Sequence, residues 1–179
     1  MVVLIILSCL FWIASLAAAF KKIILSPAFA FIGLLLISFA KKDGFPILPI
    51  NATILWGWLA MSAIVMVVTL LQPSQMNRSS LGIPYILGGA LAGMAVGLLG
   101  YTFSSNISLL YGIMVVATAV GVFLGFLFFS RTPAGKGFAP GGGLFLKYLT
   151  AKGFPVAISV MQIGVVLVIT IALHNIASL

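Results

Sequence analysis

The chain has 179 residues, of which 63% are hydrophobic and 6% charged, and its formal net charge is +8. A soluble domain of this size carries about a quarter of its residues as charged side chains, so the composition excludes a water-soluble globular fold. The apolar stretches have the length of bilayer-spanning helices and do not alternate as barrel strands do. They predict an all-α, polytopic integral membrane protein.

About six transmembrane helices are expected, in a single helical domain over residues 1–179. The first stretch lacks the basic residues that open a signal peptide, so we interpret it as a membrane helix. The longest connection, 131–154, combines a glycine-rich first half with a second half that resembles an interfacial helix, and a gating or partner-docking segment is the alternative. The expected spans are residues 2–20, 24–40, 53–71, 83–103, 108–130 and 155–177.

The basic residues fall in the connections and gather on one side of the predicted topology. That side receives Lys21, Lys22, Arg78, Arg131, Lys136, Lys147 and Lys152, whereas the other receives Lys41 and Lys42 beside Asp43. The positive-inside rule places the larger group in the cytoplasm, or in the matrix or stroma of an organelle, and both termini on the opposite, non-cytoplasmic side. We expect a bacterial inner (plasma) membrane or an organelle membrane, with the lipid bilayer rather than nucleic acid as the partner of this charge.

Residues that carry catalysis or hold metals are scarce and scattered. Cys9 lies in the first span, Asp43 in a loop and His174 near the end of the last span. Metal sites and acid–base enzymes need such residues in clusters, so no metal, cofactor or catalytic residue is predicted. An intramembrane enzyme would have to use Cys9, His174 or Lys147 without a visible companion. No expected span carries a charged residue at its centre, which disfavours an ion-coupled carrier.

Glycines recur at helical spacing in the fourth and fifth expected spans. Gly89, Gly93 and Gly97 lie at i, i+4 and i+8, and Gly121 and Gly125 repeat the spacing. A helix face without side chains lets another helix approach closely, so these residues predict a helix-packing seam of the glycine-zipper kind. Packing of the two spans against each other, a homo-oligomer interface and a substrate path are the three interpretations.

Residues 80–143 carry a pattern that resembles the small transmembrane-fourteen-like family, which includes plastid fatty-acid exporters and mitochondrial proteins linked to porphyrin transport. The resemblance implies movement of a small lipophilic molecule, with the glycines as a packing seam. This chain differs from the family by two additional spans at its start. The pattern consists of Pro84, Gly89, Gly93, Gly97, Tyr101, Ser104-Ser105-Asn106, Arg131, Lys136, Phe138, Pro140 and Gly141.

Polar residues inside the spans are few, and most are hydroxyls that bond to their own helix. Gln162 differs, because a side-chain amide in hydrocarbon needs partners. We expect it to face the bundle interior or a partner subunit, either as a structural contact or as a substrate contact. The hydroxyl residues are Ser8, Ser15, Ser62, Thr69, Thr118 and Thr170, and the aromatic belt expected near the span ends consists of Trp12, Trp56, Trp58, Tyr101 and Tyr111.

Two functions fit these observations. The first is a small transporter or channel for an uncharged or lipophilic solute, which is not coupled to ions and is expected to form a homo-oligomer. The second is a non-catalytic structural or assembly subunit of a larger membrane complex, associated with other membrane subunits.

Overall fold

The computed structural model describes residues 2–42, 45–48, 50–72, 80–100, 106–138 and 144–177, with the backbone alone for residues 42 and 174–177. Within them the chain is all-helical apart from one short strand pair, β1 (Lys41–Lys42) and β2 (Phe45–Pro46). The long helices are α1 (Val2–Lys21), α2 (Ser26–Ser38), α3 (Ala52–Leu70), α5 (Ile83–Leu99), α6 (Ile107–Ser130) and α8 (Phe154–Ala177). The short ones are η1 (Ile23–Leu25), η3 (Lys136–Phe138), α7 (Phe145–Tyr148) and η4 (Leu149–Gly153).

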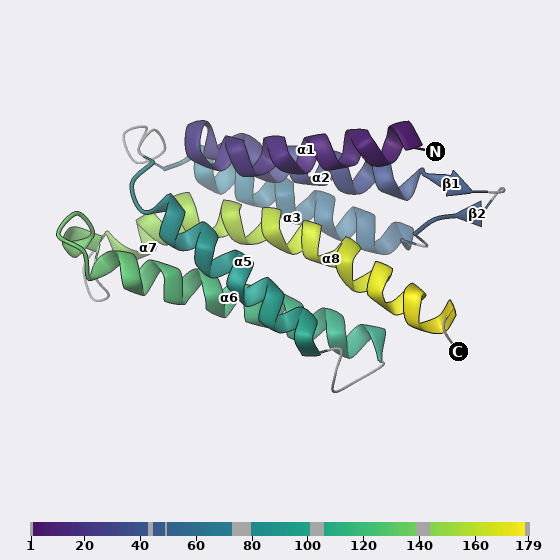
Figure 1. Cartoon of the computed structure of the whole chain (residues 1–179). Helices are drawn as coiled ribbons and strands as arrows, with labels where there is room; N and C mark the ends of the chain where they lie inside the picture. Colours follow the sequence, from purple (N-terminus) through teal and green to yellow (C-terminus); the bar gives the residue numbers. More distant parts are fainter. Residues whose placement is uncertain are drawn as a thin grey trace.

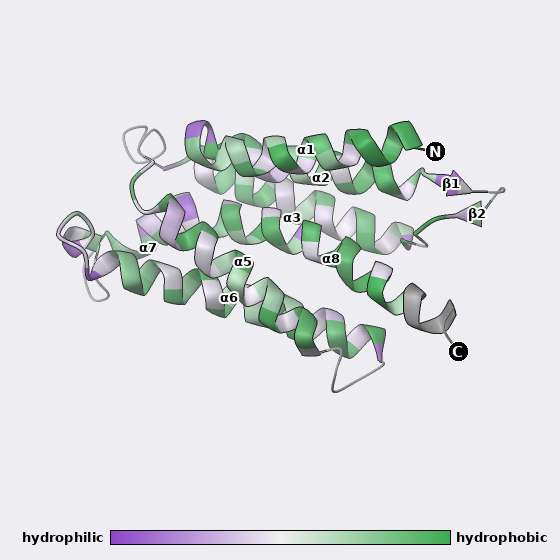
Figure 2. Ribbon diagram, viewed as in Figure 1, coloured by the Kyte–Doolittle hydropathy of each residue, from purple (hydrophilic) through white to green (hydrophobic). Residues whose placement is uncertain are grey.

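Four helical segments of the described residues are long and apolar enough to cross a membrane. They are Val2–Lys21, Ala52–Leu70, Ile107–Ser130 and Phe145–Leu173, and Ile23–Ser38 and Ile83–Leu99 are shorter apolar helices. Large apolar side chains such as Leu10, Ile64 and Val116 are exposed along the outside of the bundle. Hydrophobic residues cover the length of the helices, and hydrophilic residues lie mainly near their ends (Figure 2). This distribution suits lipid as the surrounding solvent.

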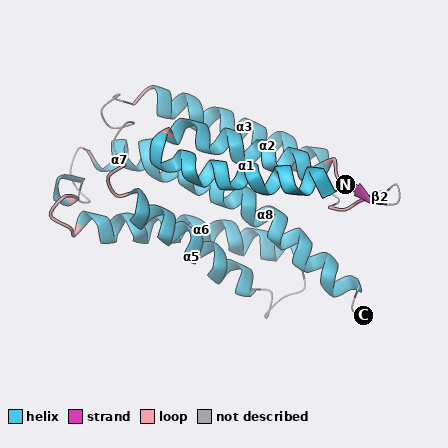
Figure 3. Cartoon of the chain, turned by 45° about the horizontal axis from the view of Figure 1, so that its top comes forward, coloured by secondary structure: helices cyan, strands magenta, loops and turns pink. Residues whose placement is uncertain are grey.

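Helix α8 is the centre of the fold. It packs against α2, α6, α5, α3 and α1, and Figures 1 and 3 show it between α1, α2 and α3 on one side and α5 and α6 on the other. In the most apolar 18-residue stretch of Phe145–Leu173, 67% of the residues are buried, against 22% in the corresponding stretch of Ala52–Leu70. The core therefore forms around α8, and the other helices expose one face each.

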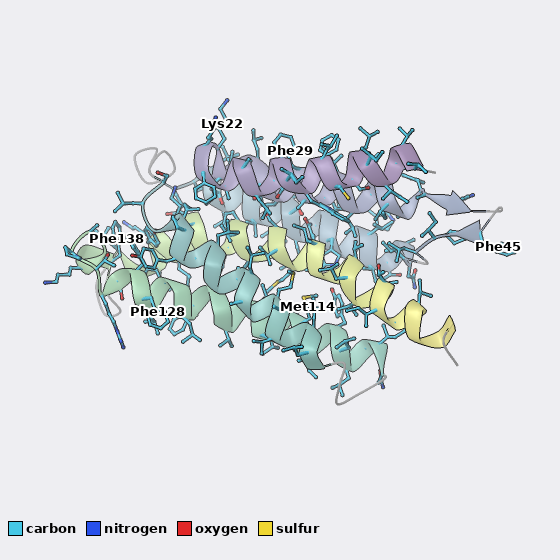
Figure 4. All side chains as sticks on the ribbon, viewed as in Figure 1. Lys22, Phe29, Phe45, Met114, Phe128 and Phe138 are labelled. Carbon is cyan, nitrogen blue, oxygen red and sulfur yellow. The ribbon has the colours of Figure 1, made fainter. Side chains whose placement is uncertain are left out.

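Both ends of the chain lie at one end of the bundle, together with β1 and β2 (Figure 1). The opposite end carries the last turn of α1, the start of α5, and α7. Lys22 projects there, whereas Phe45 lies at the end with the strands (Figure 4). Two groups of basic residues lie at opposite ends of the bundle. The end with α7 carries Lys21, Lys22, Arg131, Lys136 and Lys147, and the end with β1 carries Lys41 and Lys42. Arg78 and Asp43 lie outside the described residues.

Asparagine, glycine and proline residues determine where several helices begin. The side chain of Asn51 accepts a hydrogen bond from Thr53 N at 3.2 Å, and that of Asn106 accepts one from Ser108 N at 3.0 Å. Each caps the first turn of its helix. Gly82, with a φ of 76°, precedes α5, and Pro84 lies in its first turn. Helix α5 ends at Leu99, and the last residues of the expected span, 101–103, lie outside the described residues.

The last helix begins earlier than the sequence predicts. Residues 145–154 form α7 and η4, which continue directly into α8, so the expected span 155–177 is too short at its start. Tyr148 and Lys152 are buried in this segment and Leu146 is exposed, and the expected interfacial helix stays a prediction. Pro155 lacks the N–H that an α-helix would use here, and the π-turn of η4 directly before it accommodates the missing bond. Gly153-Phe154-Pro155 therefore lies inside a helix and does not start one.

The two glycine series face each other where α5 packs on α6. A Cβ built on Gly121 would lie 3.0 Å from Gly93 Cα and closer still to the Gly89 carbonyl oxygen. One built on Gly125 would lie 3.1 Å from Ile86 Cα, and one on Gly97 would lie 2.6 Å from Met114 Cα. The backbones are in direct contact, and only residues without a side chain fit between them.

We predict that Gly121→Ala lowers the stability of the fold by about 1–3 kcal/mol, because the added methyl group overpacks a backbone contact. Gly112→Ala is the matched control on the same helix, since a Cβ there meets nothing within 4 Å. Thermal unfolding of the purified protein in detergent measures both. Equal midpoints for the two variants would contradict the packing argument.

Candidate functional site

A cleft of about 450 Å³ lies between α3, α6 and α8. Helices α3 and α6 each pack against α8 and make at most marginal contact with each other, so α8 forms the floor of the cleft. The exposed residues Met61 and Val116 show that it opens on the outside of the bundle. Its volume lies in the usual range for small-molecule sites. The lining residues are Ile54, Gly57, Trp58, Met61, Tyr111, Gly112, Val115, Val116, Ile158 and Met161.

Trp58 and Tyr111 are the polar members of this lining. Trp58 is 6% exposed, and its Nε1 is buried. Tyr111 lies on the opposite wall, and its side chain interacts with that of Trp58. The other lining residues are apolar, so these two side chains carry the polar side-chain atoms of the lining. The sequence assigned both residues to an aromatic belt, but Trp58 is buried, whereas Trp56 is 69% exposed.

Gln162 lies beside the cleft and is fully buried. Its Nε2 donates to Ser62 Oγ at 2.7 Å across the α3–α8 contact, and its Oε1 has no partner among the described residues. Ser62 follows Met61 and Gln162 follows Met161, so the bonded pair adjoins two lining residues. The amide thus ties α3 to the floor of the cleft. Its role as a substrate or partner contact stays a prediction.

A second hollow, of about 560 Å³, covers the outer side of the α5–α6 contact. Glycine and alanine form its floor, and Tyr85 and Phe128 stand at its rim. Its lining includes Gly89, Gly93, Gly121 and Gly125, whereas Gly97 is buried between the helices. No lining side chain is charged, so this surface offers shape and apolar contact alone.

The remaining predicted residues do not come together. Cys9 is exposed on α1; Asp43 and Tyr101, and the side chain of His174, lie outside the described residues. Among the residues that the structure describes, no group of three or more His, Cys, Asp or Glu could hold a metal ion. Lys147 is on α7. Lys152, assigned by the sequence to a connection, is 1% exposed within η4.

A buried hydroxyl network went unnoticed in the sequence. Ser26 Oγ lies 2.8 Å from Ser159 Oγ and 3.2 Å from Ser15 Oγ, which joins α1, α2 and α8. Hydroxyl groups are common in membrane helices and usually bond to their own turn, as Thr118 does to the Met114 carbonyl oxygen. Nothing in the local sequence distinguishes a hydroxyl that bonds to its own helix from one that bonds to a neighbouring helix. The network is structural, because it holds the α1–α2 pair on α8.

No protein family, curated protein or solved structure matches this chain. The resemblance of residues 80–143 to the transmembrane-fourteen-like family therefore stays a hypothesis. The candidate site consists of the cleft, with Trp58 and Tyr111 on its walls and the Ser62–Gln162 bond beside it.

We predict that the Ser62–Gln162 bond stabilises the α3–α8 contact. Ser62→Ala should lower the free energy of unfolding by about 1 kcal/mol, because the buried amide loses its partner. Gln162→Leu removes the amide itself, so adding Ser62→Ala to it should cost much less. A double-mutant cycle, with unfolding followed in detergent, measures the coupling. Strictly additive effects would show that the bond contributes nothing.

Proposed function

We propose that this chain binds an uncharged or lipophilic solute from the membrane and moves it without ion coupling and without catalysis. The observation that carries the proposal is the outward-opening apolar cleft between α3, α6 and α8. A solute dissolved in lipid would reach such a cleft sideways, past Met61 and Val116, without crossing water.

The chemistry of the walls supports an uncharged solute. None of the lining residues is Asp, Glu, Lys, Arg or His. A charged group in an apolar site loses its hydration and needs a paired charge in return. Coupling to a proton or sodium ion would also need an ionisable group at the site, and the buried Lys152 lies in η4 and does not line the cleft. Passive movement of a neutral molecule needs neither.

We propose in addition that six helices span the membrane, with both termini on the non-cytoplasmic side of a bacterial inner membrane or an organelle membrane. The two shorter apolar helices pack inside the same bundle as the four longer ones. The end with β1 carries Lys41 and Lys42, and the opposite end carries the larger basic group. Both features support this topology under the positive-inside rule.

Filling the cleft tests the function. Gly112 lines it, and a Cβ there meets nothing within 4 Å, so the side chain of Gly112→Leu should narrow the cleft. Gly88→Leu is the matched control, because Gly88 lines the other hollow and a Cβ there also meets nothing within 4 Å. In nanodiscs, an uncharged aryl-diazirine probe should label Trp58 and Tyr111 saturably in the wild type and about tenfold less in Gly112→Leu.

The same variants test whether the protein moves the solute between membranes. Proteoliposomes loaded with a tritiated long-chain ketone should release it to acceptor vesicles faster than protein-free liposomes. Gly112→Leu should return the rate to the protein-free value, and Gly88→Leu should leave it unchanged. Labelling that does not saturate, together with equal release rates in all samples, would refute the proposed function.

The topology has its own measurement. In a Cys9→Ser background, Lys41→Cys and Lys136→Cys place one thiol at each end of the bundle. In vesicles with the native orientation, a membrane-impermeant maleimide should label position 41 at once and position 136 after permeabilisation. Labelling of both positions from the same side would contradict the six-span arrangement.

The second function, a non-catalytic subunit of a larger complex, is favoured by the hollow over α5 and α6. A floor of glycine and alanine lets a further helix approach closely, whether from another subunit or from a second copy. In that case Gly88→Leu should abolish co-purification of a fixed partner or a homo-oligomer in mild detergent, and Gly112→Leu should not. The two variants thus separate the two functions.

A further inference from the structure

Exposed basic residues surround the end of α6 that lies beside α7. Arg131 directly follows the last residue of α6, Lys136 lies on η3 and Lys147 on α7, and all three are exposed. Ring contacts join these elements, since the Phe138 ring lies 4.6 Å from that of Tyr148. The chain has nine Lys and Arg residues and one acidic residue. Most of its cations therefore need counterions from outside the protein.

The hollow over α5 and α6 reaches this basic end of the bundle. Its lining on α6 includes Leu124 and Phe128, and Arg131 follows Leu124 by about two helical turns. Because Arg131 keeps the backbone angles of a right-handed helix, it continues the lined face of α6. On α5 the lining begins in the first turn with Tyr85, whose ring lies 6.0 Å from that of Phe129.

The length of the hollow matches one leaflet of a membrane. Its lining falls within residues 85–96 of α5 and 117–128 of α6, and a helix rises 1.5 Å per residue, which gives about 16 Å. The hydrocarbon core of a bilayer is about 30 Å thick, so each leaflet fills about half of it. Tyr85 and Phe128, on the two sides of the hollow, are 47% and 60% exposed and form walls for a narrow apolar chain.

We propose that the hollow holds an acyl chain of an anionic phospholipid, with the lipid phosphate bound to Arg131. The guanidinium group suits a phosphate, because it donates two parallel hydrogen bonds to the phosphate oxygens. Lys136 adds a second positive charge at the same end. The hollow shares no lining residue with the solute cleft. The lipid site therefore goes beyond the proposed function and does not depend on it.

Two other occupants fit the hollow less well. A membrane-spanning helix, which the second candidate function would place there, would lie along the whole of Ile107–Ser130, whereas the lining stops about halfway, at residue 117. A lipid without net charge would fill the hollow but leave the neighbouring cations without a counterion. An anionic lipid satisfies both the apolar walls and the charge at their end.

Native mass spectrometry of the full chain in detergent tests the charge. With equal amounts of dioleoyl phosphatidylglycerol and phosphatidylcholine, the wild type should retain the first about five- to tenfold more. Arg131→Gln should lower this preference about fivefold and leave phosphatidylcholine retention unchanged. Lys22→Gln is the matched control with the same change of charge, because Lys22 lies on the α1 side and Phe128 on the α6 side (Figure 4). It should keep the preference of the wild type.

Gly88→Leu tests whether the acyl chain lies in the hollow. Gly88 lines it, and a Cβ there meets nothing within 4 Å, so this variant should lose about tenfold in retention of both lipids. Glycerophosphoglycerol, the headgroup without acyl chains, should not displace phosphatidylglycerol at a hundredfold excess. Thermal unfolding shows whether Gly88→Leu is folded, and the comparison of Arg131→Gln with Lys22→Gln does not depend on it.

Four results would overturn the lipid site. Equal retention of the two lipids by the wild type would show that no anion is selected, and equal losses in Arg131→Gln and Lys22→Gln would show a diffuse effect of surface charge. Displacement by the headgroup alone would show a phosphate site without a lipid chain. A second protein chain that co-purifies with the wild type and is lost in Gly88→Leu, while lipid retention stays the same, would show a helix in the hollow.

Discussion

The packing of α8 against helices from both halves of the chain determines the rest of the structure. Because α3 and α6 both pack on α8 and barely on each other, a gap opens between them that α8 closes from below. In lipid, no hydrophobic force draws helices together, so shape and polar contacts decide which faces meet. The candidate site thus arises because α3 and α6 pack on different parts of the α8 surface and leave a space between them.

Glycine has opposite roles at the α5–α6 contact and at the cleft. Gly89 and Gly121 lie against backbone and hold α5 and α6 in contact. A Cβ added to Gly57 or Gly112 would meet nothing within 4 Å, and these glycines instead leave the cleft open. The residue type is the same, and what lies opposite each glycine decides whether it permits contact or leaves space. A spacing of four residues therefore identifies the first role, and the second has no sequence signal.

Several sequence predictions are confirmed, and the exceptions have local causes. The described part of the chain is all-helical, and its apolar helices begin and end near the expected residues. The start of the last helix is wrong, because Gly153-Phe154-Pro155 has the composition of a helix start and the π-turn that absorbs Pro155 leaves no trace in hydropathy. Trp58 was assigned to the membrane interface, because the tryptophans near a span end look alike until rotation about the helix axis is known.

By itself, the sequence determined that the chain consists of apolar helices of membrane-spanning length, with the basic residues near their ends, since hydropathy and length are local properties. The tertiary structure alone decided that Ser62 meets Gln162, that Ser26 meets Ser159, and that Trp58 and Tyr111 face one cleft. These contacts join residues as far apart as 133 positions. They depend on how each helix is rotated and which neighbour it packs against, and no local pattern records either.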